Sequence, residues 1–84
     1  MYHFVYMIKS IKYGKIKTYV GYTNNLKKRL NKHNLGKGAK STRGRSWKIL
    51  YSEKCFTKSK AISREYYVKK NRKLRNQIIE NFKW

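Results

Sequence analysis

Residues 16–26 read IKTYVGYTNNL, a run that changes from strand-like to helix-like character over a few positions. The β-branched residues Ile16, Thr18 and Val20 share one parity, which predicts a β-strand in the first half of the run. The asparagine pair near its end offers a helix N-cap, and the residues that follow keep helical spacing. Gly21 lies inside the predicted strand, where a glycine indicates a bulge or the close approach of another backbone or a ligand.

The segments on either side of this run follow the same two periodicities. Alternating aromatic and aliphatic residues predict a strand before it, Tyr13 and Gly14 predict a hairpin loop between the two strands, and Trp47 begins a third strand. We expect strands over residues 2–9, 16–22 and 47–56, and helices over residues 26–34, about 57–70 and about 72–82. The expected order is β-β-α-β-α-α, a three-stranded, mostly antiparallel sheet flanked by helices, which belongs to the α+β class.

The charge of the chain is strongly one-sided. It carries 23 lysines and arginines against three glutamates, a formal net charge of +20 on 84 residues. Such a field predicts a polyanionic partner, and nucleic acid is the leading candidate. The hydrophobic content of 39% is too high for a disordered basic tail. We therefore expect one folded domain over residues 1–84, acting as a monomer.

Several other classes of protein do not fit the composition. There is no long apolar run and no signal peptide, so we expect a cytoplasmic protein with no membrane partner. One cysteine and two histidines do not have the spacing of a zinc site.

The segment 36–46, GKGAKSTRGRS, reads as a small, flexible, basic loop with almost no apolar content. Its cations Lys37, Lys40, Arg43 and Arg45 predict contacts with nucleic-acid phosphates, which position a nucleic acid without reading its sequence. The plainer alternative is a loop that is merely solvated.

The glutamates are conspicuous in so basic a chain, because a carboxylate on a phosphate-binding surface repels the ligand. On the second expected helix, Glu65 falls within the apolar arc shared by Ala61 and Val68. A carboxylate there needs an ion pair or a metal ion. On the residues alone, a structural pair with an arginine or lysine is the more frequent arrangement. Glu53 and Glu80 are expected to be ordinary charges, at a strand edge and on an exposed helix.

Arg29 and His33 form an i, i+4 pair beside the leucine stripe of the first expected helix. There an arginine can bind a phosphate through two hydrogen bonds, and a histidine can transfer a proton near neutral pH. The plainer alternatives are packing of the arginine stem and a histidine bond to a backbone carbonyl. Tyr6 and Tyr19 lie in the middle of strands, where tyrosine is common because it packs well.

Taken in order, short motifs of the chain resemble those of the GIY-YIG nuclease family. They are YVG at 19–21 with YTNNL at 22–26, RLNKHN at 29–34, GAKSTRGR at 38–45 before Trp47, and AISRE at 61–65. The first motif is FVY at residues 4–6, with phenylalanine in place of the glycine, as in small stand-alone members. The resemblance covers about residues 2–70 and is nearest to small bacterial members and structure-selective junction nucleases. The family's asparagine near the last helix has three possible counterparts, Asn71, Asn76 and Asn81.

The resemblance implies hydrolysis of DNA phosphodiester bonds with one divalent ion, Mg²⁺ or Mn²⁺. Glu65 would be the only protein ligand of that ion. Tyr6 would be the general base for water, with its pKa lowered from about 10 by the surrounding cations and the metal. Tyr19 would orient the water or the phosphate, Arg29 would bind the scissile phosphate, and His33 would support proton transfer or Tyr6.

Two functions stay open at this stage. One is an endonuclease acting on branched or flapped DNA in repair or recombination; the other is a nucleic-acid-binding module without catalysis. The clustered site residues favour the nuclease, because binding alone requires no buried carboxylate. Stand-alone members lack the additional DNA-binding module of many relatives, so a protein partner would direct substrate choice or specificity would be loose.

Overall fold

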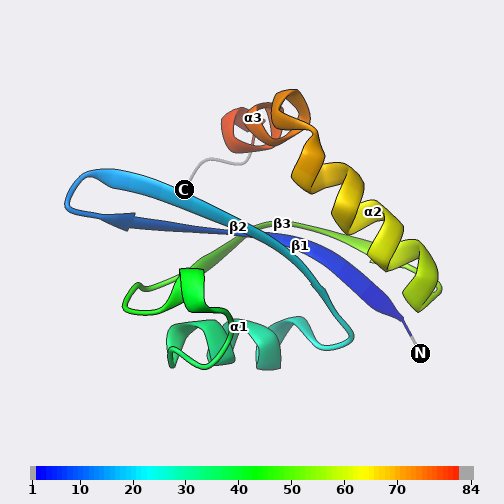
Figure 1. Ribbon diagram of the computed structural model, residues 1–84, viewed down its shortest axis with the longest axis horizontal. Helices are drawn as coiled ribbons and strands as arrows, with labels where there is room; N and C mark the ends of the chain where they lie inside the picture. Colours follow the sequence, from blue (N-terminus) through cyan, green and yellow to red (C-terminus); the bar gives the residue numbers. More distant parts are fainter. Residues whose placement is uncertain (1, 82–84) are drawn as a thin grey trace.

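A three-stranded antiparallel sheet carries helices on both of its faces in the computed structural model, which describes residues 2–81 (Figure 1). The elements are β1 (His3–Lys12), β2 (Lys15–Thr23), α1 (Leu26–Asn34), the 3-10 helix η1 (Lys40–Thr42), β3 (Lys48–Cys55), α2 (Lys58–Lys70) and α3 (Arg72–Asn81). β1 lies in the middle of the sheet, between β2 and β3. The α+β class and the predicted order of strands and helices are confirmed. Phe82, the expected end of the last helix, lies outside the described residues.

The central strand β1 is buried on both faces. Its successive side chains point to opposite sides of the sheet, and helices cover both sides. Val5 and Met7 pack with the buried residues of α2 and α3 in one hydrophobic cluster. Tyr6 and Ile8 form a second cluster with Trp47, and the leucines of α1 pack against it. The side chain of Tyr6 therefore lies on the α1 side of the sheet, which decides its neighbours in the site.

The hairpin between β1 and β2 is longer than the sequence pattern predicts. The two strands pair without interruption until Lys12 faces Lys15. Only Tyr13 and Gly14 form the turn, both with positive φ, 53° and 74°. A two-residue turn of this hand matches the twist of the flanking strands, so the ladder continues where a longer loop was expected.

Side chains cap the starts of α1 and α2, as predicted for the asparagine pair before α1. Asn25 accepts a hydrogen bond from the Lys28 backbone N–H, and Thr57 accepts one from the Lys60 backbone N–H, both at 3.1 Å. These bonds satisfy amide groups that the first turn of a helix leaves without partners. Within residues 2–81, none of the helices combines the length and the apolar character that spanning a bilayer requires.

The basic segment predicted as a flexible loop is partly buried and forms η1. Thr42 is fully buried, and its backbone oxygen accepts a hydrogen bond from the indole Nε1–H of Trp47 at 2.8 Å. Lys17 on the hairpin donates to the Ser41 carbonyl at 2.7 Å. Lys17 is distant in sequence and Trp47 lies just outside the basic segment, so the composition of the segment itself gave no sign of either contact.

Candidate active site

A cavity of about 410 Å³ lies along the C-terminal half of β2, which is an edge strand. Tyr19, Arg29 and Glu65 line it, so residues from β2, α1 and α2 meet there. Lys69 of α2 also extends to this edge of the sheet. Its Nζ lies 5.9 Å from the centroid of the Tyr19 ring on β2. The other lining residues are His3, Gly21, Tyr22, Thr23, Asn24 and Lys58.

Tyr6 lies directly behind this cavity, and its hydroxyl bridges Arg29 and His33. The oxygen is 2.8 Å from Nε2 of His33 and accepts a hydrogen bond from Nε of Arg29 at 3.3 Å. The Tyr19 ring lies beside this pair, tilted by 57° relative to the His33 ring, with the two ring centroids 5.0 Å apart. All the catalytic residues predicted from sequence thus lie in or next to one site.

Gly21 makes room for the Tyr6 side chain. The two residues face each other across the β1–β2 pair. A Cβ atom at Gly21 would lie 2.5 Å from the Tyr6 hydroxyl oxygen, which is too close for two atoms that are not bonded. The expected close approach is real, but the approaching group is a tyrosine side chain. The sheet irregularity falls elsewhere, between Met7 and Ile8 in the β1–β3 pairing.

His33 is completely buried between the sheet and the basic segment. Its Nδ1 lies 2.9 Å from the hydroxyl oxygen of Thr42, on the side of the ring opposite Tyr6. Gly38 lies so close that a Cβ there would clash with Nδ1. Sequence reasoning missed Thr42 as a site residue; the only signal for it is its place within the motif at 38–45.

Burial sets the protonation of the Tyr6–His33 pair. Burial raises the pKa of Tyr6, and this outweighs the hydrogen bond and charge of Arg29, which lower it. Burial also lowers the pKa of His33, and the positive charge of Arg29 lowers it further. At neutral pH the pair is therefore a phenol beside a neutral imidazole. The expectation of a lowered Tyr6 pKa is wrong for the protein without a bound ion.

The lowered pKa of His33 predicts that the protein loses stability in mild acid. The unfolded chain, with a histidine pKa of about 6.5, binds more protons than the folded state at slightly acidic pH. The free energy of unfolding should therefore fall as the pH decreases from about 7.5 through about 6.5 to about 5.5. Urea unfolding at these pH values checks this expectation. A His33→Gln variant should show a flatter profile, and an equally steep one would assign the dependence to other groups.

Glu65 is mostly covered, with 19% of its side chain exposed, and its Oε1 lies 3.2 Å from Nζ of Lys69. The lysine is one helical turn further along α2 and is 46% exposed. Such an i, i+4 pair is weak, so the lysine can leave without great cost. The carboxylate of Glu65 therefore stays available on the wall of the cavity.

The residues of the cavity fit a hydrated divalent ion held at one point. Mg²⁺ keeps several of its water ligands and is commonly bound through one or two carboxylates. Among residues 2–81, no three histidine, cysteine or acidic side chains are grouped closely enough to enclose a metal ion. A closed cage is thus absent from this part of the chain, whereas attachment to the Glu65 carboxylate alone is compatible with the site.

The second glutamate, Glu53, is not the ordinary edge charge that the sequence suggests. It accepts hydrogen bonds from Nε of Arg64 and from the hydroxyl of Tyr51, the latter at 2.6 Å. The glutamate–arginine pair considered for Glu65 therefore exists at Glu53, between β3 and α2. Glu80 is exposed on α3, as predicted.

The four basic residues predicted to contact phosphates fall into two groups. Lys37, Lys40 and Arg43 reach solvent. Arg45 is half-buried and donates from Nε to the Ser10 hydroxyl at 3.2 Å and from a terminal nitrogen to the Lys15 carbonyl at 3.1 Å. Arg45 thus attaches the segment to the hairpin, while the other three side chains are accessible to a ligand.

The asparagines considered near the last helix lie away from the cavity. Asn71 accepts a hydrogen bond from the Leu74 backbone N–H at 2.9 Å and so caps the start of α3. Asn76 and Asn81 lie on that helix. None of the three lines the cavity beside Glu65.

Comparison with known proteins relates this chain to a catalytic domain. A family model described as the GIY-YIG catalytic domain matches residues 2–78. A UPF0213 protein of Bacillus licheniformis is 48% identical over 80 residues, which are 93% of this chain and 79% of the relative. A UPF0213 protein of Haloquadratum walsbyi is 40% identical over 94% of this chain and 88% of its own length. The solution NMR structure of the UPF0213 protein BH0048 from Bacillus halodurans covers 95% of this chain and 84% of that one, with 38% identity and a TM-score of 0.52.

Proposed function

The chain belongs to the GIY-YIG nuclease family, and from this premise we propose that it is a metal-dependent endonuclease that hydrolyses DNA phosphodiester bonds. The observation that carries the proposal is the position of the Tyr6 hydroxyl. It lies between Arg29 and His33, directly behind a cavity whose wall holds Glu65. We further propose branched or flapped DNA as the substrate, in repair or recombination.

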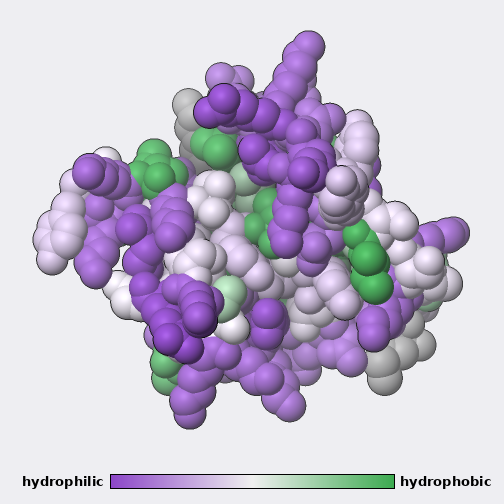
Figure 2. All heavy atoms as spheres, in the orientation of Figure 1, coloured by the Kyte–Doolittle hydropathy of each residue, from purple (hydrophilic) through white to green (hydrophobic). Residues whose placement is uncertain are grey.

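Positive charge holds the substrate. The formal net charge is +20, and hydrophilic side chains cover much of the face shown in Figure 2. Arg29 lines the cavity, so a phosphate that enters it meets a guanidinium, which can bind two phosphate oxygens at once. Lys58, which also lines the cavity, adds a second cation. Contacts of this kind position DNA without selecting a sequence.

Tyr6 and His33 would activate the attacking water together. Because the pKa of Tyr6 is raised, a free phenolate is scarce, and the phenol must lose its own proton as it takes one from water. Nε2 of His33, 2.8 Å away, is the acceptor. One water O–H bond breaks, the water oxygen bonds to phosphorus, and the ester bond to the leaving oxygen breaks. The leaving oxygen then takes a proton from solvent water. A negative phosphate bound beside Arg29 offsets the positive charge of that arginine, which otherwise disfavours a protonated His33.

Glu65 would hold the divalent ion at the cavity wall. Such an ion, when bound, stabilises negative charge on the phosphate and on the leaving oxygen. The Lys69 side chain would move away from the carboxylate, which its exposure allows. A chain with three acids can support this arrangement, since one carboxylate is enough.

A cleavage assay on four DNA substrates tests the proposed function. Duplex, flap, four-way junction and single-stranded DNA are incubated with the protein in Mg²⁺, in Mn²⁺ and in EDTA. We expect cleavage only with a divalent ion, and fastest on the flap or the junction. Tight binding to all four substrates without cleavage in either metal would instead support the alternative, a nucleic-acid-binding module.

DNA affinity should fall steeply with salt concentration. A protein that neutralises phosphates releases counterions, and each contact contributes about −0.9 to the slope of log K against log salt on duplex DNA. Replacing Lys37, Lys40 and Arg43 together by alanine should make the slope shallower by about 3, since each of these cations is expected to neutralise one phosphate. Fluorescence anisotropy between about 50 and about 200 mM salt measures this change. An unchanged slope would show that these three side chains do not contact phosphates.

A further inference from the structure

The hydroxyl of Thr42 has three polar neighbours in a buried position. Its oxygen lies 2.9 Å from Nδ1 of His33, 2.9 Å from the Ala39 carbonyl oxygen and 3.2 Å from the Ala39 amide nitrogen. A hydroxyl has one hydrogen to donate and two lone pairs to accept with. Its three neighbours can therefore be assigned one by one.

Two of the three neighbours have fixed roles. The Ala39 amide can only donate, so it occupies one lone pair of the Thr42 oxygen. The Ala39 carbonyl can only accept; it also accepts from the Thr42 backbone N–H, but its oxygen and the hydroxyl oxygen are 2.9 Å apart and would repel each other without a hydrogen between them, so it receives the hydroxyl hydrogen. The remaining lone pair faces Nδ1 of His33, which must then carry a hydrogen. We propose that Thr42 is a positioning residue that fixes His33 as the Nδ1–H tautomer and leaves the lone pair of Nε2 facing Tyr6.

The opposite end of the imidazole leads to the same assignment. Arg29 can only donate to the Tyr6 oxygen. If Nε2 of His33 also carried a hydrogen, it would donate to that oxygen too, and the hydroxyl hydrogen of the buried Tyr6 would have no acceptor among these groups. With a lone pair on Nε2, each hydrogen in this chain of contacts has an acceptor. Tyr6 donates to His33, His33 donates to Thr42, and Thr42 donates to the Ala39 carbonyl. Buried polar groups are nearly always satisfied in this way.

The tautomer matters because the proposed reaction uses a proton relay, in which Tyr6 passes its proton to His33. In this respect the inference rests on the proposed function. Nε2 can accept the Tyr6 hydrogen only if it carries a lone pair. In the other tautomer, the nearest base to the Tyr6 hydroxyl is already protonated. Thr42, which is too far along the relay to touch the substrate, thus sets the direction in which the proton moves.

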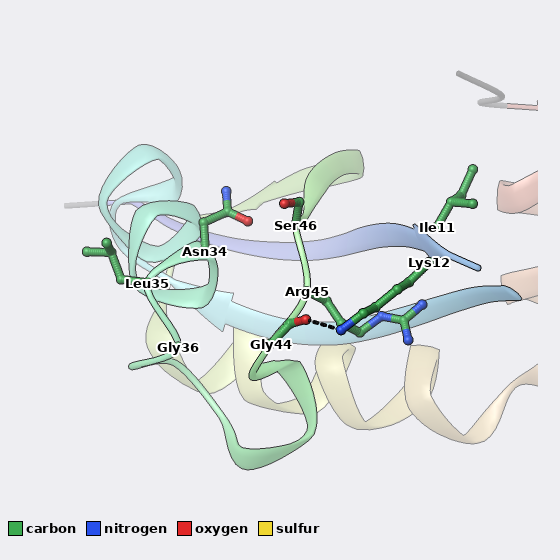
Figure 3. Close-up of a pocket in the computed structure, with 8 residues that line it drawn as sticks. All are labelled: Ile11, Lys12, Asn34, Leu35, Gly36, Gly44, Arg45 and Ser46. Carbon is green, nitrogen blue, oxygen red and sulfur yellow. Dashed lines mark hydrogen bonds between the residues drawn. The ribbon is translucent and has the colours of Figure 1, made fainter. Parts of the chain in front are cut away.

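The segment that carries Thr42 is attached firmly enough to do this. Lys12 on the hairpin donates to the Gly44 carbonyl at 2.8 Å, beside Arg45, at the cavity shown in Figure 3. Lys17 and Trp47 hold the segment on either side of the hydroxyl. Gly38 packs against Nδ1, and a Cβ at this position would clash with the ring. The basic segment therefore has a structural role in addition to the phosphate contacts proposed for it.

The test compares Thr42→Val, which removes the hydroxyl at nearly equal volume, with Thr42→Ser, which keeps it. Ser41→Ala is the control, because the Ser41 backbone oxygen that Lys17 binds is unchanged by it. The tautomer is read from the ¹⁵N shifts of the His33 ring by long-range ¹H–¹⁵N NMR. We expect Nδ1–H in the wild type, the serine variant and the control, and a mixed or Nε2–H population in the valine variant.

Cleavage provides the second measurement. We expect Thr42→Val to cleave about 10- to 100-fold more slowly at unchanged DNA affinity, the range found when a partner that orients a metal-bound histidine is removed. Thr42→Ser should retain most of the activity. An Nε2–H tautomer in the wild type, or a valine variant with unchanged tautomer and rate, overturns the proposal. The wild-type spectrum decides the tautomer even if the valine variant does not fold, and also if no DNA is cleaved, which would refute only the nuclease.

Discussion

Replacing Glu65 by glutamine should abolish metal-dependent DNA cleavage while DNA affinity stays the same or increases. The amide keeps the size of the side chain but removes the charge that would hold the divalent ion. A bound metal ion contributes several kcal/mol of charge stabilisation, so we expect cleavage to fall by about 10³-fold or more. Affinity should not fall, because the lost charge repels phosphate. Single-turnover cleavage and fluorescence anisotropy, on the same DNA, measure the two effects separately.

Glu80→Gln is the matched control for this experiment. It makes the same change of charge on the exposed face of α3, away from the cavity, and should leave cleavage unchanged. Lys69→Met adds a second comparison, since it removes the partner of Glu65 without touching the carboxylate. If Glu65 serves only as a structural ion pair, both Glu65→Gln and Lys69→Met should reduce stability, and binding and cleavage should fall together.

The fold could be predicted because its signals are local. Alternation marks the strands, and Asn25 and Thr57 mark the helix starts, so each element is visible within a short window. A bulge or the close approach of another group could be predicted at Gly21, because a glycine inside a strand commonly marks one or the other. The group that approaches it, the Tyr6 ring, depends on strand pairing and was not visible from Gly21 alone.

The acidic residues show where sequence reasoning stops. Helical spacing placed Glu65 on a covered arc, and the structure leaves only 19% of its side chain exposed. Spacing within a helix cannot show that Arg64 turns toward β3 and pairs with Glu53. Charge pairs between different elements depend on how those elements pack. The two alternatives for Glu65 could therefore be stated from sequence, but the pairs could not be assigned.

The basic segment and the Tyr6 pKa were misjudged for a related reason. The composition predicted a flexible, phosphate-contacting loop and a lowered Tyr6 pKa, since composition reports charge but not burial. Thr42 is fully buried, and Tyr6 is only 2% exposed. Desolvation at that depth outweighs the nearby charge of Arg29. Burial of this kind arises from contacts between distant segments, so it becomes visible only with the fold.

Replacing Tyr6 by phenylalanine should reduce cleavage by about 10²- to 10⁴-fold, the usual contribution of a positioned general base. The ring keeps its place across Gly21, so the fold should persist. Loss of the hydroxyl leaves Nε2 of His33 and Nε of Arg29 without their partner, which should cost about 1–3 kcal/mol of stability. DNA affinity should not change, because the hydroxyl lies behind the cavity. Single-turnover kinetics, anisotropy and urea unfolding give the three quantities.

Tyr51→Phe is the control that separates loss of a hydroxyl from loss of the base. It removes the hydroxyl of a second tyrosine, which is partly buried and donates to Glu53 on β3. A comparable loss of stability with normal cleavage is expected, because this tyrosine does not line the cavity. If Tyr6→Phe instead cleaves DNA at the wild-type rate, the attacking water loses its proton to another group. The relay from Tyr6 to His33 would then have no part in the reaction.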